Sequence, residues 1–259
     1  MDLGIRGRKA LVCASTQGLG LACATSLAQE GCEVWINGRQ ADKVRQVAAQ
    51  LAQQTGAVVH GVAADITTEA GRAALLAACP APDILINNNA GPNPGKLADW
   101  AHDAWIEALE SNMLAPALLI RAVVPGMRER KFGRIVNITS AMVKQPRPRM
   151  ALSTGARAGL TAFAKSVSLD VAVDNVTINC MLPERIDTDR QRFMAERMMK
   201  DLGVDMAEAR RRIADGIAAK RFGTPKEFGD ACAFLCSEQA SFISGQNLQL
   251  DGGSYPGLI

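Results

Sequence analysis

The sequence predicts an α/β protein built on one doubly wound parallel sheet, with helices on both faces of the sheet. Strand-like apolar runs alternate with helix-like segments along all 259 residues, which is the pattern of repeated strand-helix-strand units. A glycine-bearing turn joins the first strand to the first helix. Hydrophobic residues make up 48% of the chain and charged residues 21%, and no repeat or linker marks a boundary. A single domain covering residues 1–259 is therefore expected.

The segment 9–31 sets the organisation of the chain. Residues 10–14 form an apolar run typical of a buried strand, and Gly18 and Gly20 open a helix with apolar residues at helical spacing. Backbone amides at a helix start lack intrahelical acceptors, and the helix dipole adds positive charge there. This turn therefore suits a pyrophosphate. A glycine pair alone also fits an ordinary strand-helix turn, so the decision rests on the remaining sequence.

The composition speaks against several classes of function. The net charge of +3 is small, which gives no support for a nucleic-acid or membrane partner. Seven cysteines are scattered in apolar segments, as expected of reduced core residues in a cytoplasmic protein. His60 and His102 are the only histidines, too few for a zinc site or a Ser-His-Asp triad. Without an apolar span of 18 residues or an N-terminal signal, we expect a soluble, cytoplasmic chain that holds no metal.

The second strand, expected at 33–37, ends at Gly38 and Arg39. In a dinucleotide fold an acidic residue here accepts hydrogen bonds from the adenosine ribose, whereas an arginine pairs with a 2′-phosphate. Because the chain offers Arg39 and no acidic residue, NADP(H) is favoured over NAD(H); a solvated arginine at a helix start is the alternative. The alternation continues with a helix at 41–53, a strand at 58–63 followed by Asp65 and Ile66, a helix at 69–78 and a strand at 83–87.

The fourth strand leads into a loop at 87–95, Asn-Asn-Asn-Ala-Gly-Pro-Asn-Pro-Gly. This loop lies at the sheet edge where open α/β sheets bind ligands. A long helix expected at 103–128 carries Asn112 in its middle, an unfavourable position for asparagine. The strand at 134–139 delivers Ser140. A basic, turn-rich segment at 141–149, a helix at 152–173 and a strand at 176–181 that ends before Pro183 and Glu184 follow.

Residues 186–220 differ from the rest of the chain. They hold four methionines among many arginines and predict two helices over the sheet edge. Methionine suits a mobile lid over a ligand, and ordinary helix packing is the alternative. The run Arg210-Arg211-Arg212 is interpreted as a solvated face. A helix at 225–237 and a strand at 247–250 precede Asp251-Gly252-Gly253 and the C-terminal tail.

With these pieces in place, the chain resembles the short-chain dehydrogenase/reductase family over nearly all its length, and most nearly its β-ketoacyl carrier-protein reductase-like branch. Each match alone is weak, but their order and spacing together indicate a nicotinamide dinucleotide site on a Rossmann-type fold. The matching segments are 13–20 (Cys-Ala-Ser-Thr-Gln-Gly-Leu-Gly, for Thr-Gly-x-x-x-Gly-x-Gly), Asp65, 87–91 (for Asn-Asn-Ala-Gly), Asn112, Ser140, 221–227, 244–246 and 251–253.

The resemblance implies that NADP(H), or less favourably NAD(H), is bound by residues at the carboxyl edge of the sheet. They are Ala14, Ser15, Gln17, Gly18, Leu19, Gly20, Arg39, Asp65, Ile66, Asn88, Arg157, Pro183 and Ile186. The expected catalytic group consists of Ser140, Asn112, Ser153, Arg157 and Lys144. The family positions of Ser140 and Asn112 imply that these side chains polarise a carbonyl or hold a water.

Departures from the family pattern bear on the mechanism. The first motif glycine is Ala14, and an extra asparagine in 87–89 leaves the alignment of that motif open by one residue. Glu184 replaces the glycine of a Pro-Gly pair near the expected nicotinamide. Counting thirteen residues on from Ser140, and then four more, the catalytic Tyr-x-x-x-Lys is replaced by Ser153 and Arg157.

In the family, the tyrosine phenol exchanges the proton on the substrate oxygen, and the lysine lowers the phenol pKa and holds the nicotinamide ribose. Ser153 is too short to take that position, and its hydroxyl is a far weaker acid than a phenol. Arg157 can bond the ribose hydroxyls but exchanges no proton at neutral pH. The resemblance therefore implies that the usual proton donor is missing.

Three side chains are candidates for a substitute acid. Tyr255, the only tyrosine, lies in the tail, which in family oligomers can reach a neighbouring subunit's site; a surface position is the alternative. Lys144 can donate a proton or bind an anionic group, and Arg147 and Arg149 strengthen the anion interpretation. Glu184 is the third candidate, although a helix-start or lid contact is its favoured use.

Two functions remain open. The first is an NADP(H)-dependent oxidoreductase that interconverts a carbonyl and an alcohol on an anionic or acyl substrate, with Ser140 polarising the oxygen, Arg157 holding the ribose, and Lys144 or an ordered water as an atypical proton donor. The second is a catalytically silent dinucleotide-binding sensor or partner subunit. The long helices around Asn112 and Arg157 resemble those that pair family members, so a homo-oligomer, a dimer or a tetramer, is expected.

Overall fold

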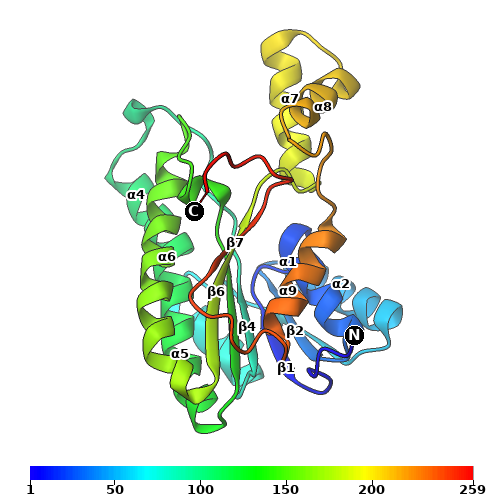
Figure 1. Cartoon of the computed structure of the whole chain (residues 1–259), viewed down its shortest axis with the longest axis vertical. Helices are drawn as coiled ribbons and strands as arrows, with labels where there is room; N and C mark the ends of the chain where they lie inside the picture. The colour runs from blue at the N-terminus through cyan, green and yellow to red at the C-terminus, as the bar shows by residue number, and fades with distance from the viewer. Residues whose placement is uncertain (259) are drawn as a thin grey trace.

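Within residues 1–258, which this computed structural model describes, a seven-stranded sheet forms the centre of the molecule, in the order β3-β2-β1-β4-β5-β6-β7 (Figure 1). Neighbouring strands pair in parallel, so their carboxyl ends lie at one edge. The doubly wound sheet predicted from the sequence is confirmed. The strands are β1 (Lys9–Val12), β2 (Glu33–Gly38), β3 (Val59–Ala63), β4 (Ile84–Asn87), β5 (Gly133–Ile138), β6 (Val176–Pro183) and β7 (Asn247–Leu250).

Helices cover both faces of the sheet (Figure 1). Val12 and Val34 pack in one apolar cluster with α1, α2 and α9, whereas their neighbours Leu11 and Trp35 pack in a second cluster with α3, α5 and α6. Burial on both faces explains why the strands are continuous apolar runs. The helices are α1 (Gly18–Gln29), α2 (Ala41–Thr55), α3 (Glu69–Ala78), α4 (His102–Leu109), α5 (Ala115–Glu129), α6 (Ala151–Val171), α7 (Asp189–Leu202), α8 (Met206–Asp215) and α9 (Pro225–Cys236).

Two strand ends differ from the sequence-based prediction by two residues. β1 ends at Val12 and not at residue 14, because the backbone of Ala14 turns into the left-handed region with φ +44°. β6 extends beyond residue 181 to Pro183, because its last residues pair with β7 up to Leu250. Both differences lie at the carboxyl edge of the sheet, where the chain turns towards the candidate site.

The helix predicted at 103–128 is not a regular α-helix. A π-helical turn, η2 (Glu110–Leu114), joins α4 to α5 and contains Asn112. The Asn112 side chain is buried, and its Nδ2 donates hydrogen bonds to Ser111 Oγ at 2.7 Å and to the Ala90 carbonyl at 3.3 Å. A π turn of this kind is frequent at functional sites. The unusual asparagine therefore marks a local change of helix geometry.

The continuous helical stretch His102–Glu129 is apolar and long enough to cross a membrane, judged by length and composition alone. This corrects the expectation that the chain contains no apolar span of this kind. Leu119, Ile120 and Val123 of this stretch pack in the second cluster against the sheet. A core helix of a soluble protein can have the same length and apolar composition, so a single such helix is weak evidence for a membrane-spanning segment.

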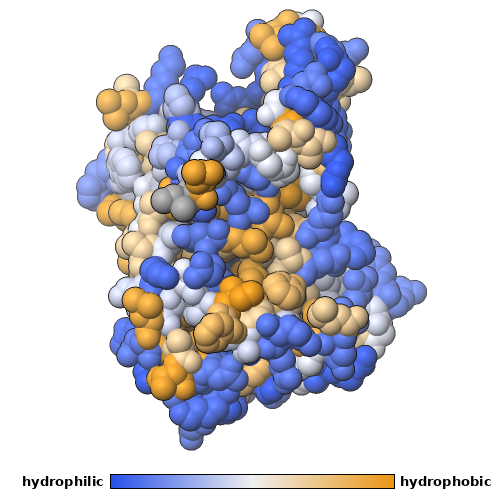
Figure 2. Space-filling view, viewed as in Figure 1, coloured by the Kyte–Doolittle hydropathy of each residue, from blue (hydrophilic) through white to orange (hydrophobic). Residues whose placement is uncertain are grey.

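Helices α7 and α8 form an arm that projects beyond the carboxyl edge of the sheet (Figure 1). The two helices predicted within 186–220 are thus present. Ala195, Ala209 and Ile213 form a small apolar cluster of the arm's own, with methionine and Phe222 side chains packed against it. Figure 2 shows mostly hydrophilic residues on the outside of the arm.

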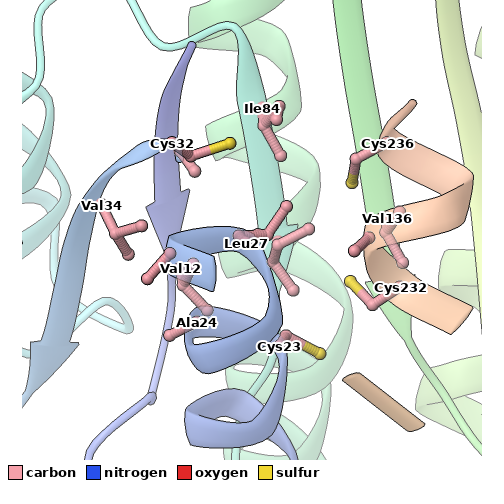
Figure 3. Packing of buried hydrophobic residues seen from close by; sticks show 14 of the residues in the cluster. Val12, Cys23, Ala24, Leu27, Cys32, Val34, Ile84, Val136, Cys232 and Cys236 are labelled. Carbon is pink, nitrogen blue, oxygen red and sulfur yellow. The ribbon is translucent and has the colours of Figure 1, made fainter. Parts of the chain in front are cut away.

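The cysteines are core residues, as predicted. All seven are free and buried. Figure 3 shows Cys23 on α1 and Cys232 and Cys236 on α9 among the side chains of the first cluster. Burial raises the pKa of the Cys13 thiol to about 12. The Cys13 thiol is therefore protonated at neutral pH, and the seven side chains belong to the packing of the core.

Candidate active site

The turn between β1 and α1 holds Ala14 in a conformation that usually requires glycine. Its φ is +44°, a region in which a Cβ is unfavourable. Both peptide groups of Ala14 are fixed, because its N–H donates to Asn37 Oδ1 at 3.2 Å and its carbonyl accepts from Asn88 Nδ2 at 3.0 Å. Asn88 thus supports the turn. The alanine found in place of the motif glycine keeps the left-handed turn.

Gly20 allows the start of α1 to approach this turn closely. A Cβ at Gly20 would lie 2.5 Å from the Ala14 carbonyl oxygen and 2.8 Å from Asn88 Nδ2. Within residues 1–258, no side chain caps the amides at this helix start, where Gln17 is the N-cap, and the first turn holds no acidic residue. Backbone N–H groups there are positioned to bind an anion. This helix start therefore has backbone N–H groups that are available to an anion.

Other residues assigned to the cofactor serve the structure around this turn. The buried Ser15 hydroxyl donates to the Val12 carbonyl at 2.7 Å and accepts from the Asn37 N–H at 3.0 Å. Gln17 accepts a hydrogen bond from Lys43. Ile66 is buried in the second cluster, and Leu19 is half-buried against the first. Ser15 and Ile66 therefore shape the site without exposing their side chains.

Arg39 and Asp65 lie close together at the ends of β2 and β3. The Thr67 hydroxyl and N–H donate to Asp65 Oδ1 at 2.7 Å and 3.0 Å. These bonds lower the Asp65 pKa, and the positive charge of Arg39 lowers it further. Arg39 itself is exposed. An exposed guanidinium beside the end of β2 is available to pair with a phosphate.

Three of the five residues expected to be catalytic lie against the loop after β4. Ser153 and Arg157, one turn apart on α6, are 7% and 8% exposed. A Cβ at Gly91 would lie 3.6 Å from Ser153 Oγ and 3.3 Å from Arg157 Nη2, so the loop packs directly on both side chains. Asn112 is bonded to the neighbouring Ala90 carbonyl. Asn112, Ser153 and Arg157 are therefore brought together around residues 89–91.

The Arg157 guanidinium donates hydrogen bonds to backbone carbonyls at the end of β5 and in the loop after β4. Its Nη1 donates to the carbonyls of Ile138 and Thr139 at 2.7 Å and 2.8 Å, and its Nη2 donates to the Asn89 carbonyl at 3.4 Å. Burial lowers its pKa to about 10, and repulsion from Arg190 contributes, so Arg157 remains protonated at neutral pH. The end of β5 is thus tied to the loop after β4, immediately before Ser140.

Ser140 begins the short helix η3 (Ala141–Val143), and its Oγ accepts a hydrogen bond from the Met142 N–H at 3.2 Å. Its own hydroxyl proton is not used in that bond. Lys144 follows η3, and its ammonium lies 5.5 Å from the centroid of the Tyr255 ring of the same chain. Sequence reasoning considered Tyr255 only in relation to a neighbouring subunit and missed this contact, because no local pattern relates residues so far apart in the chain.

The remaining candidates lie where β6 ends. Pro183 is the last residue of β6, and Ile186 forms an isolated bridge with Gly223. Glu184 forms an ion pair with Arg147 at 2.5 Å; this partner lies in the loop after β5 and not in the arm. Arg149 is exposed and has φ +66°. Its carbonyl accepts the Gly95 N–H at 2.9 Å, so Arg149 supports the loop after β4.

Arg190, in the first turn of α7, is a residue that sequence reasoning missed. Repulsion from its charge contributes to the lowered pKa of Arg157, after burial. Burial lowers the pKa of Arg190 as well, with Arg197 contributing. The acidic Asp189 directly follows the N-cap Thr188, as is usual at a helix start, so no local signal in the sequence pointed to Arg190.

Comparisons with known proteins agree with this architecture. A family model described as Enoyl-(Acyl carrier protein) reductase matches residues 13–255. The chain belongs to the short-chain dehydrogenase/reductase family. Among members of this family, it is 33% identical over 252 residues to the NADPH-dependent reductase BacG of Bacillus subtilis, with 95% of this chain and 97% of that protein covered.

The family likeness extends to other reductases. The chain is 30% identical over 260 residues to the 3-oxoacyl-(acyl-carrier-protein) reductase FabG of Aquifex aeolicus, covering 98% of this chain and 100% of that protein. The L-sorbose reductase of Gluconobacter frateurii, solved in complex with NADPH and L-sorbose, has a TM-score of 0.95 at 32% identity, with 100% of both chains covered. The family and the fold expected from the sequence are therefore confirmed.

Proposed function

We propose that the chain is an NADP(H)-dependent oxidoreductase that interconverts a carbonyl group and an alcohol. The observation that carries this proposal is the close approach of Gly20 to the turn: a Cβ at Gly20 would lie only 2.5 Å from the Ala14 carbonyl oxygen. Such a turn opens helix amides to a pyrophosphate. The NADPH-dependent reductase and the NADPH complex among the relatives support the same cofactor class.

The residues present fit this cofactor. The uncapped amides at the start of α1 would hold the pyrophosphate, and the exposed Arg39 would pair with the 2′-phosphate. Asp65, kept ionised by Thr67, would accept hydrogen bonds on the adenine side. When bound, the nicotinamide supplies or accepts a hydride at the substrate carbon.

The chain's own groups act on the substrate oxygen. The Ser140 hydroxyl donates a hydrogen bond that polarises the carbonyl. The Lys144 ammonium gives a proton to that oxygen in reduction and takes it back in oxidation. Arg157 is a positioning residue in this account, because it bonds the two carbonyls that directly precede Ser140. Tyr255 lies against Lys144 and holds its side chain at the site.

A second candidate function is a silent dinucleotide-binding sensor or partner subunit. It is favoured by Ser153, which stands on α6 beside Arg157 and supplies no phenol. In this case the cofactor binds and no hydride is transferred. The two functions thus share a binding site and differ only in turnover.

The experiment that separates them is a fluorescence titration of the purified chain with NADPH and with NADH. The same sample is then assayed for hydride transfer to a panel of carboxylated and neutral ketones. NADPH binding with turnover supports the oxidoreductase, and binding without turnover on the whole panel supports the silent protein. Failure to bind either nucleotide overturns both.

We further propose that residues 186–220 act as a lid over this site. The support is that the arm has a small apolar cluster of its own and brings Arg190 towards Arg157. Hinged elements of this kind move on the microsecond to millisecond timescale. Hydrogen exchange of α7 and α8 that slows on addition of NADPH would support the proposal, and unchanged exchange would contradict it.

A homo-oligomer is proposed from the outer surface of the helices around Asn112 and Arg157. Ile106 on α4, Leu114 in η2 and Leu169 on α6 are 51%, 43% and 72% exposed. Exposed apolar side chains on helices of this length are suited to pair with a second copy. Light scattering of the purified chain distinguishes a dimer or tetramer from a monomer.

A further inference from the structure

A cavity of about 200 Å³ lies between the arm and the carboxyl edge of the sheet, apart from the β1–α1 turn. It is lined by the loop after β5, the end of β6, helices α7 and α8, and the C-terminal tail. Drug-sized ligand pockets are usually about 300–1000 Å³, so this cavity suits a small substrate or one end of a larger one. Its polar lining residues are Arg147, Glu184, Arg185, Arg212 and Ser254.

The cavity lining carries more positive than negative charge. Arg147 Nη2 and Arg185 Nε lie 2.5 Å and 3.7 Å from the same carboxylate oxygen, Oε1 of Glu184, so two guanidinium groups share one negative charge. Arg212 also lines the cavity and is paired with Glu208, on the same helix, at 2.7 Å. One positive charge of the Arg147–Glu184–Arg185 group is therefore left without a counter-ion in the cavity.

The backbone of Arg185, at the wall of the cavity, has an unfavourable conformation. Its φ is +58°, in the left-handed region that is unfavourable for a residue with a Cβ. The backbone is fixed on both sides, because Glu184 N–H bonds the Leu250 carbonyl at 2.9 Å and the Arg185 carbonyl accepts the Gly223 N–H at 3.1 Å. Strain that the surroundings maintain in this way is typical of functional sites.

The Arg185 environment also disfavours its charge. Burial lowers the Arg185 pKa, and repulsion from Arg147 lowers it further, while Glu184 partly offsets both. A second anion in the cavity would relieve this repulsion, since opposite charges favour the ionised form of each partner.

Ser254 adds a hydrogen-bonding group with no partner. Its Oγ is buried and, within residues 1–258, forms no hydrogen bond, although it lines the cavity. The tail that carries it is folded around Asp251, whose carboxylate accepts the N–H groups of Gly253 and Tyr255 at 2.9 Å each. A buried, unbonded hydroxyl is unfavourable, and a ligand oxygen in the cavity would satisfy it.

We propose that this cavity binds the oxyanion group of the substrate, a carboxylate or a phosphate, through Arg147, Arg185 and Ser254. Arginine binds both groups through paired N–H donors. Glu184 is the counter-ion that holds the two arginines when no substrate is bound, and the incoming anion competes with it. Met198 and Ile213 line the arm side and cover the apolar part of the ligand. The inference rests on the proposed function and identifies the substrate as an anionic carbonyl compound.

The first test measures binding without any reaction. Isothermal titration with succinate, and with its neutral dimethyl ester at equal ionic strength, is carried out on the full chain. We expect succinate to bind and the ester not to bind. The variants Arg147→Gln and Arg185→Gln should each weaken succinate binding about 10- to 100-fold, the range expected for a hydrogen bond to a charged group. Equal binding of ester and acid, or no binding of either, overturns the proposal.

Two further variants keep the test decisive if an arginine variant fails to fold. Glu184→Gln removes the competing carboxylate and should tighten succinate binding, an effect that misfolding cannot produce. Arg192→Gln changes an exposed arginine of α7 that is paired with Glu196 and lies outside the cavity, and it should leave binding unchanged. Weaker binding in Glu184→Gln would contradict the counter-ion role.

The second test measures substrate preference. 3-Oxobutanoate is compared with its methyl ester, and dihydroxyacetone phosphate with dihydroxyacetone, each with NADPH. We expect the preferred anion to exceed its neutral partner about tenfold or more in kcat/KM, and Arg185→Gln to remove the preference. The pair that shows the effect distinguishes carboxylate from phosphate. Turnover without a preference for the anionic substrate overturns this inference and leaves the proposed function standing. If succinate binds but no substrate is turned over, the proposed function is overturned and the anion site remains.

Discussion

The Lys144 ammonium lies 5.5 Å from the centroid of the Tyr255 ring, within one chain. This distance is that of a cation–π contact. The contact joins the C-terminal tail to the loop after β5. It also suggests a different role for each of the two residues. The ring of Tyr255 can hold Lys144 in place, and the ammonium of Lys144 can carry the proton.

The proton donor can be identified by changing these two residues. Lys144→Arg keeps the positive charge and the ring contact but retains its proton at neutral pH, so kcat should fall about 100-fold or more. NADPH affinity should not change. Tyr255→Phe keeps the ring and should leave kcat within about threefold of the parent. The reverse pattern, with activity lost only in Tyr255→Phe, would assign the proton to the phenol.

Gly20→Ala should damage both the fold and the cofactor site. The new Cβ would meet the Ala14 carbonyl oxygen at 2.5 Å, and a backbone atom cannot move aside cheaply, so a loss of about 2–3 kcal/mol is expected. Gly18→Ala is the matched control, because nothing lies within 4 Å of its added Cβ and only the cost of φ +58° remains. Urea unfolding and NADPH titration of both variants check this order. Equal effects would mean that the close approach is unimportant.

Ala14→Gly should stabilise the protein by about 0.5–1 kcal/mol. Glycine removes a cost of about 1–2 kcal/mol at φ +44°, and this gain exceeds the roughly 0.4–1 kcal/mol by which glycine favours the unfolded chain. The control Ala22→Gly lies inside α1 and should destabilise by about 1 kcal/mol. Chemical denaturation gives both values. A destabilised Ala14→Gly would show that the alanine methyl group contributes packing that outweighs its strain.

Acid stability should depend on Glu227. The Arg221 guanidinium, with the Thr224 N–H, holds the Glu227 pKa at about 2, below its usual 4.5. The folded state therefore gains stability above pH 4.5 and loses it as the pH falls towards 2. Glu227→Gln keeps a side chain able to complete the capping box with Thr224 but removes the charge. Its unfolding midpoint should be lower than that of the parent at pH 7 and should match it near pH 2. A constant difference across this range would contradict the assignment.

The sequence predicted most elements because their causes are local. The apolar spacing that placed a helix at 69–78 and a strand at 247–250 agrees with the observed α3 and β7. The same holds for the two helices of the arm. The π turn at Asn112 was not predicted, because its extra residue per turn leaves only a weak trace in the apolar pattern.

The candidate site was predicted in part. The segments that reach the carboxyl edge could be inferred from strand ends, so Ser153, Arg157 and Asn112 were expected together. Their partners could not be inferred, because the bonds of Arg157 to backbone carbonyls and the Arg147–Glu184 pair join distant parts of the chain. Charge pairing between loops depends on the path of each loop, which no periodic pattern encodes.

The separate apolar cluster of α7 and α8 has a consequence for how such a chain changes over generations. Ala195, Ala209 and Ile213 pack with one another and not with the two layers beside the sheet. Substitutions in the arm therefore alter what it covers without disturbing the scaffold that would hold the nucleotide. The arm can therefore change over generations while the nucleotide-binding framework is inherited intact.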